Sequence, residues 1–154
     1  MDAVRTELVN LLNGGQAFEP FATVVNSFKT SERGVVPKGA ERSPWQIVEH
    51  MQLSLRDLLD FSKNEKGGYK EKKWPEDYWP KHSEPKPGEW DHSVQAFQAG
   101  IDEFKKLLAE SARDLTEPFP WGSGQTLMHE VLLAAEHSAY HIGELIELQR
   151  WIRA

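Results

Sequence analysis

Residues 43–62 read SPWQIVEHMQLSLRDLLDFS, and this stretch decides the fold. Ser43 followed by Pro44 is a helix start signal, because the hydroxyl caps free N–H groups and proline fits the first helical position. Beyond them, apolar side chains recur at helical spacing along one face, while Glu49 and Arg56 lie on the opposite face. The pattern predicts an amphipathic core helix that ends at about residue 62. Its apolar stripe comprises Ile47, Val48, Met51, Leu55, Leu58, Leu59 and Phe61.

The same periodicity predicts helices on either side of this stretch. They cover residues 3–12, 91–111 and 127–152, and a further apolar segment at 17–28 is interrupted by Pro20 and only partly helical. No window shows the alternation of a strand. A connection of 27 residues, 64–90, contains four prolines. The chain is therefore predicted to be an all-α four-helix bundle with long crossover connections, forming a single domain over residues 1–154.

The composition excludes several classes of protein. The chain has 154 residues, no cysteine and a net charge of −6. Without cysteine there is no disulfide framework, thiolate zinc site or cysteine nucleophile. An acidic chain is repelled by phosphate backbones, so no nucleic-acid partner is expected. No apolar run approaches the roughly 18 residues of a membrane span, and the N-terminus lacks an apolar signal core. We therefore expect no membrane partner and a cytoplasmic location.

Three histidines are candidates for chemistry. His137 and His141 are four residues apart, which places both imidazoles on one face of the 127–152 helix. Both lie at the edge of its apolar stripe, as His50 does on the 44–62 helix, whereas His129 lies on the polar side. The three imidazoles could converge on one divalent ion. The alternative is that each is a separately satisfied, partly buried histidine.

Other motifs are absent or incomplete. Only His92 has a glutamate three residues before it, Glu89, and the di-iron bundle pattern needs two such pairs on two helices, which excludes this class. His129-Glu130 begins like the zinc-protease motif HExxH, but Leu133 occupies the fifth position. Two carboxylates are candidates to orient an imidazole, Asp57 for His50 and Glu144 for His141, and the alternative for each is a solvated surface carboxylate.

Four segments together resemble the DinB-like superfamily, also called DinB/YfiT-like metalloenzymes. They are SPWQIVEHMQLSLRDLLDF (43–61), KKWPEDYWP (72–80), GEWDHSV (88–94) and GSGQTLMHEVLLAAEHSAYHIGELIELQRWI (122–152), and the last is the most specific. The resemblance implies a four-helix bundle that holds one divalent metal with three histidines. At the matching positions of this chain they are His50, His137 and His141. The cofactor would be zinc or nickel first, with iron or manganese as further candidates.

The resemblance also implies an activity. Family members of known function are metal-dependent enzymes that act with low-molecular-weight thiols, such as bacillithiol transferases and mycothiol-dependent isomerases. We therefore expect a metal-dependent thiol S-transferase or hydrolase with a small-molecule substrate. The alternative is a non-catalytic metal-binding or interaction module with a structural or empty site. Two further expectations concern the surface: the aromatic connection between Trp74 and Trp90 closes the site or covers the core, and the numerous tryptophans favour a homodimer.

Overall fold

The computed structural model describes residues 2–154, and this part of the chain is helical without a strand. The all-α prediction is therefore confirmed. Two short 3₁₀ turns, Thr30–Glu32 and Asn64–Lys66, lie in the connections on either side of α3. The five α-helices are α1 (Ala3–Asn13), α2 (Phe21–Asn26), α3 (Pro44–Ser62), α4 (Glu89–Glu110) and α5 (Leu127–Arg153).

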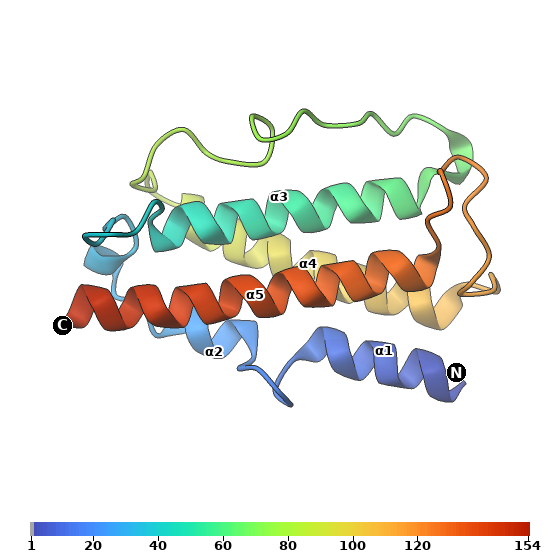
Figure 1. Ribbon diagram of the computed structural model, residues 1–154, viewed down its shortest axis with the longest axis horizontal. Helices are drawn as coiled ribbons and strands as arrows, with labels where there is room; N and C mark the ends of the chain where they lie inside the picture. Colours follow the sequence, from blue (N-terminus) through green and yellow to red (C-terminus); the bar gives the residue numbers. More distant parts are fainter. Residues whose placement is uncertain (1) are drawn as a thin grey trace.

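α3 packs against both of the other long helices, and the two N-terminal helices lie on the side of α4 and α5 away from α3 (Figure 1). α3 contacts both α4 and α5, α1 contacts α4 and α5, and α2 contacts α5. α3 and α4 run in the same direction, while α5 runs opposite to both (Figure 1). The connection between α3 and α4 must therefore return along the length of α3, which explains why it is so long.

Both helices that carry the candidate histidines begin where the sequence predicts. At the start of α3 the Ser43 hydroxyl accepts from the Gln46 backbone N–H at 3.2 Å, and Gln46 Oε1 accepts from the Ser43 N–H at 3.1 Å. This reciprocal pair satisfies two N–H groups that have no partner within the helix. At the start of α5 the Thr126 hydroxyl accepts from the His129 N–H at 3.1 Å.

α4 begins earlier than predicted, and the predicted boundary at residue 90 is wrong. The helix starts at Glu89 because Gly88 adopts a left-handed conformation (φ +85°) that turns the chain into the first helical turn. Trp90 consequently belongs to α4 and not to the connection. It is buried, meets the Phe28 ring edge-on at 5.8 Å and lies beneath the Arg33 guanidinium. Trp90 is thus a core residue and takes no part in covering a site.

The antiparallel pair α3 and α5 forms a seam with polar residues at two successive levels. His50 of α3 meets His137 of α5 at one level. Seven residues further along α3 is Asp57, and seven residues earlier in α5 is Glu130. Because seven residues are about two helical turns, these two carboxylates share a second level of the same seam. Both carboxylates are buried, although they are charged residue types and their neighbours on the two helix faces are apolar.

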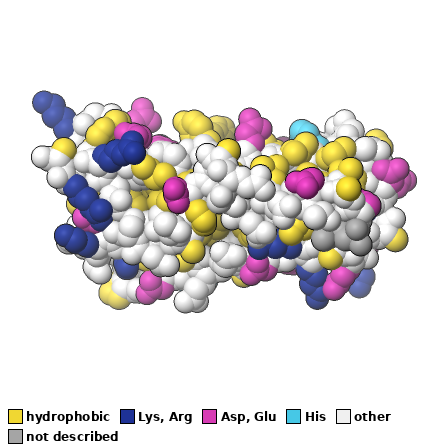
Figure 2. Space-filling view, turned by 90° about the horizontal axis from the view of Figure 1, so that it is seen from below, with side chains coloured by type: hydrophobic (Ala, Val, Ile, Leu, Met, Phe, Trp, Pro, Cys, Tyr) yellow, Lys and Arg dark blue, Asp and Glu magenta, His cyan; other side chains and the backbone are white. Residues whose placement is uncertain are grey.

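The surface shows no concentration of one charge on the side formed by α1 and α2. Figure 2 views the molecule from this side, with acidic and basic side chains interspersed among hydrophobic ones. None of the helices in residues 2–154 combines the length and the apolar character needed to cross a membrane.

Candidate metal centre

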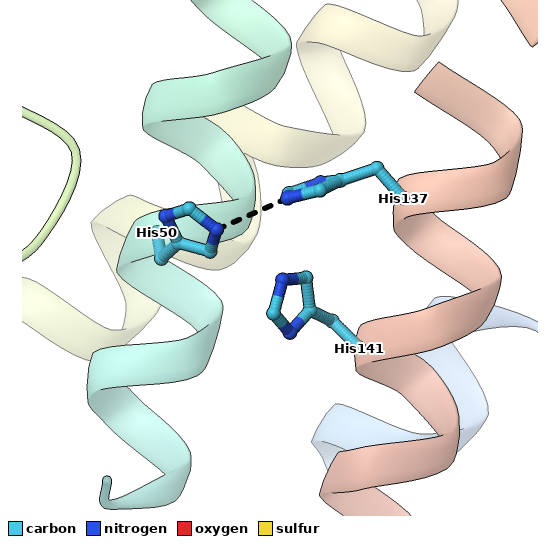
Figure 3. Close-up of side chains that lie close together, drawn as sticks. All are labelled: His50, His137 and His141. Carbon is cyan, nitrogen blue, oxygen red and sulfur yellow. Dashed lines mark hydrogen bonds between the residues drawn. The ribbon is translucent and has the colours of Figure 1, made fainter. Parts of the chain in front are cut away.

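The structure brings all three predicted histidines together between α3 and α5. His50 projects from α3 toward His137 and His141 of α5 (Figure 3). One ring nitrogen from each lies within 4.8 Å of the others, and Nε2 of His50 is 3.0 Å from Nε2 of His137. His50 and His141 are only 2% and 5% exposed. His129 is exposed and lies outside the group, as its place on the helix predicts.

A backbone carbonyl orients the His50 ring. Nδ1 of His50 lies 2.9 Å from the carbonyl oxygen of Tyr78. Because a carbonyl oxygen can only accept, Nδ1 must carry the proton in the neutral ring. The Nε2 lone pair is then directed toward His137. Sequence reasoning did not identify this partner, because a backbone atom in a connection carries no residue-type signal.

A carboxylate orients the His141 ring in the same way. Nδ1 of His141 lies 2.8 Å from Oε2 of Glu144, one turn further along α5. The carboxylate accepts a hydrogen bond from Nδ1–H, and in the neutral ring Nε2 of His141 then carries no proton. The structure therefore gives Glu144 the orienting role that its spacing suggested. Such carboxylate–histidine pairs are typical of imidazoles that bind metals.

Asp57 does not contact His50, so the suggestion that it orients this imidazole is wrong. Seven residues of helix span about 10.5 Å, which is too far for a hydrogen bond. The carboxylate instead accepts from the Tyr78 hydroxyl at 2.7 Å and from the Tyr69 hydroxyl at 3.3 Å. Asp57 thus acts on the centre indirectly, because Tyr78 also supplies the carbonyl oxygen that orients His50.

Burial keeps two of the histidines in the neutral form. Desolvation is the main cause that lowers the pKa of His50 to about 4 and the pKa of His137 to about 3. The neighbouring imidazoles of the group lower both values further, because one positive charge disfavours another. Both rings are therefore neutral at physiological pH, which is the form that binds a metal ion.

The donor set fits one transition-metal ion. Two imidazole nitrogens bound to the same tetrahedral zinc ion are about 3.3 Å apart, given Zn–N bonds of about 2.0–2.1 Å. The observed 3.0 Å between the Nε2 atoms of His50 and His137 requires only a small adjustment. Three nitrogen donors suit zinc, nickel, iron or copper rather than magnesium or calcium, which prefer oxygen. In the described part of the chain, no other group of three histidine or carboxylate side chains meets the same distance limit.

A pocket of about 690 Å³ opens onto the three histidines. The Trp79 ring stacks on the His50 ring, with centroids 3.8 Å apart and planes at 6°. Trp74 meets His50 edge-on, and Tyr140 and Trp151 of α5 line the pocket with it. The connection between α3 and α4 therefore covers one side of the site, which is one of the two alternatives open for its tryptophans.

Fold and site together define an all-helical protein with a candidate three-histidine metal centre held between two antiparallel helices. The family model of the DinB superfamily matches residues 16–145, and the chain belongs to this superfamily. The resemblance seen in the sequence is thereby confirmed. Comparison with curated proteins and comparison with solved structures gave no match.

Proposed function

We propose that this protein binds one divalent transition-metal ion through His50, His137 and His141 and uses it to catalyse a reaction of a small molecule. One observation carries the proposal. Three nitrogens converge on one point of the seam, and Tyr78 and Glu144 direct the free nitrogens of His50 and His141 toward it. Zinc and nickel are the first candidates, followed by iron and manganese.

The neutral ligand set supports a catalytic role over a purely structural one. When bound, a divalent ion with three uncharged ligands supplies Lewis acidity at a coordination position that the protein leaves open. The chain's own residues shape the space beside that position. Trp79 shields one face of His50 from water, and Glu144 holds the His141 ring through Nδ1. A centre that served only stability would have no need of an adjoining pocket.

The size of the pocket limits the substrate to a small molecule. A volume of about 690 Å³ is in the range of sites for small molecules. The chain contains no cysteine, so any reactive sulfur must come from a substrate. Members of the DinB-like superfamily with known function act with low-molecular-weight thiols, and on that resemblance we propose thiol S-transfer with such a thiol, or hydrolysis, as the reaction type. For the fold, we propose a four-helix bundle in which α1 and α2 together take the place of one helix. The predicted homodimer stays a prediction.

Elemental mass spectrometry of untagged protein tests the proposal. The wild type should retain about one equivalent of a transition metal, measured for zinc, nickel, iron and manganese together. Replacement of His50, His137 and His141 by Ala should abolish this content. His129→Ala is the matched control, since His129 is exposed on the same helix as two of the three, and it should retain the metal.

Two results would contradict the proposal. If the wild type stays free of metal after incubation with zinc and nickel, the three histidines are buried core residues and the protein is an interaction module. If His129→Ala loses as much metal as the triple variant, binding does not depend on the seam. Metal retention without any turnover of thiol or ester substrates would leave a non-catalytic metal-binding protein.

A further inference from the structure

A second pocket, of about 540 Å³, lies one heptad along the α3–α5 seam from the histidines. α3 contributes Asp57 and Phe61, and α5 contributes Glu130. The connection after α3 adds Tyr69 and Glu71, and the loop before α5 adds residues 121–123 and Gln125. None of the three histidines of the candidate metal centre lines it. This pocket is therefore separate from the site proposed above.

Glu130 is buried without a partner. The residue is 3% exposed, yet within residues 2–154 its carboxylate makes no hydrogen bond and no ion pair, and it lines the pocket. Burial raises the pKa of this carboxyl, His129 opposes the shift, and the nearby charge of Asp57 acts in the same direction as burial. The carboxylate oxygens are not fully enclosed, since the fully buried unpartnered side-chain atoms in residues 2–154 are Arg33 Nε and Trp45 Nε1. They therefore reach the pocket, where a bound cation would offset part of the cost of desolvation.

The other two carboxylates of the pocket form no ion pair in residues 2–154, although Asp57 also lines a neighbouring pocket that contains Arg56, Lys63, Lys70 and Lys72. Asp57 accepts hydrogen bonds only from the hydroxyls of Tyr69 and Tyr78, which are neutral. In the described chain Glu71 takes part in no ion pair, and no lysine or arginine lines the pocket. His129 is the single basic group at its wall. The pocket thus presents three carboxylates and no permanent positive charge.

Aromatic rings form the wall beside these carboxylates. Phe61 meets the Tyr69 ring edge-on, with centroids 5.4 Å apart. Trp121 is held in place because its indole N–H donates to the Phe61 carbonyl oxygen at 2.8 Å. Carboxylates next to aromatic faces are the combination that recognises ammonium groups. The carboxylates do not converge closely enough to qualify as a metal-binding group, so a compact metal ion fits less well.

We propose that this pocket binds an organic ammonium ion, with the charged nitrogen between Glu130 and Asp57 and the apolar part against Phe61 and Trp121. The proposal is independent of the metal centre. It rests on the unpartnered buried carboxylate, on the absence of a compensating cation at the wall and on the aromatic lining.

Isothermal titration calorimetry on the full chain tests this site with two probes of the same shape. The 2-phenylethylammonium ion carries the charge, and 2-phenylethanol replaces the ammonium by a neutral hydroxyl. The cation should bind. The alcohol should bind at least about tenfold more weakly, because it carries no positive charge to pair with the carboxylates. Binding of the cation should weaken as salt is added.

Substitutions locate the binding to this pocket. Glu130→Gln keeps the shape and removes the charge, and should weaken binding of the cation by about tenfold or more. Glu136→Gln is the control on the same helix, because Glu136 is exposed and does not line the pocket, and it should leave binding unchanged. Glu71→Gln, at an exposed wall position, should weaken binding a few-fold and keeps the test possible if Glu130→Gln does not fold.

Three results would overturn the proposal: no binding of the cation at millimolar concentration, equal binding of cation and alcohol, or equal affinity in wild type and both pocket variants. The triple variant of His50, His137 and His141 separates this proposal from the proposed function. It should still bind the cation, whatever its metal content. Loss of cation binding in a folded triple variant would mean that the probe occupies the histidine pocket instead.

Discussion

Nδ1 of His50 donates to the carbonyl oxygen of Tyr78 at 2.9 Å, so a side chain of α3 is oriented by the backbone of the connection that follows it. No substitution of Tyr78 removes that oxygen. Its place depends instead on the Tyr78 hydroxyl, which donates to Asp57 at 2.7 Å and anchors the connection to α3. The two hydrogen bonds place Tyr78 between Asp57 and His50.

Tyr78→Phe should therefore weaken metal binding although the residue is not a ligand. Without this anchor the carbonyl oxygen can move away from His50. We expect the metal affinity to fall about tenfold, which is the lower end of the effect of removing the partner that orients a metal ligand. Competition with a chromophoric chelator measures the affinity. Tyr69→Phe is the control, since its hydroxyl reaches the same carboxylate but its carbonyl does not contact His50. Equal losses in both variants would refute the anchoring role.

Glu144→Ala should weaken metal binding by about 10–100-fold, because His141 loses the acceptor that fixes its ring and its tautomer. Glu147→Ala is the matched control. Glu147 lines the same pocket on the same helix, but it pairs with Arg150 and not with a histidine. The same chelator competition applies. An unchanged affinity in Glu144→Ala would show that His141 needs no partner to bind.

Acid should destabilise the metal-free protein before it titrates the buried histidines. The pKa of His50 is about 4 and that of His137 about 3 in the folded chain, against about 6.5 when unfolded. As the pH falls below about 6.5, the unfolded chain takes up protons that the folded chain does not, so the free energy of unfolding decreases. This loss continues until the pH reaches the folded values, about 4 and about 3.

Urea unfolding of chelator-treated protein at about pH 7.5 and about pH 5 measures this effect. We expect each of the two histidines to contribute a loss on the order of 2 kcal/mol, or about 4 kcal/mol together. His137→Gln cannot take up a proton at this position and should lose clearly less stability between the two pH values. A wild type as stable at the lower pH as at the higher one would contradict the neutral buried state.

Two glycines should respond in opposite ways to alanine. A Cβ at Gly100 of α4 would lie 2.7 Å from Cδ2 of Leu55, a buried residue of α3, so Gly100→Ala should destabilise the fold by about 1–3 kcal/mol. A Cβ at Gly143 of α5 meets nothing within 4 Å, so Gly143→Ala should stabilise it by about 0.5–1 kcal/mol. Thermal unfolding measures both. A stabilised Gly100→Ala would mean that α3 and α4 are not in close contact there.

Helical periodicity predicted the parts of the site that belong to helices. Ser43 caps α3 as expected, and α5 begins at residue 127 as predicted. The positions of His50, His137 and His141 at the edges of apolar stripes directed them toward a neighbouring helix. Position on an amphipathic helix determines which way a side chain points, so this information is present in the sequence.

The partners supplied from outside the helices could not be predicted in this way. The Tyr78 carbonyl belongs to a connection, whose path depends on tertiary packing and not on a periodic pattern. Trp90 was assigned to that connection because Gly88 offers no capping side chain to mark the start of α4. The burial of Glu130 could have been predicted, because this residue lies seven positions before His137 and therefore on the same face of α5.

The seam between α3 and α5 has a consequence for how the chain reaches its native state. His50 and His137 are 87 residues apart in sequence, and both polar levels of the seam join the same two distant segments. Contacts over such separations form only after the loop between them has closed, so they come late and slow folding. Neither pocket can exist in a nascent chain from which α5 has yet to emerge. The two pockets should therefore form together, when α5 docks on α3.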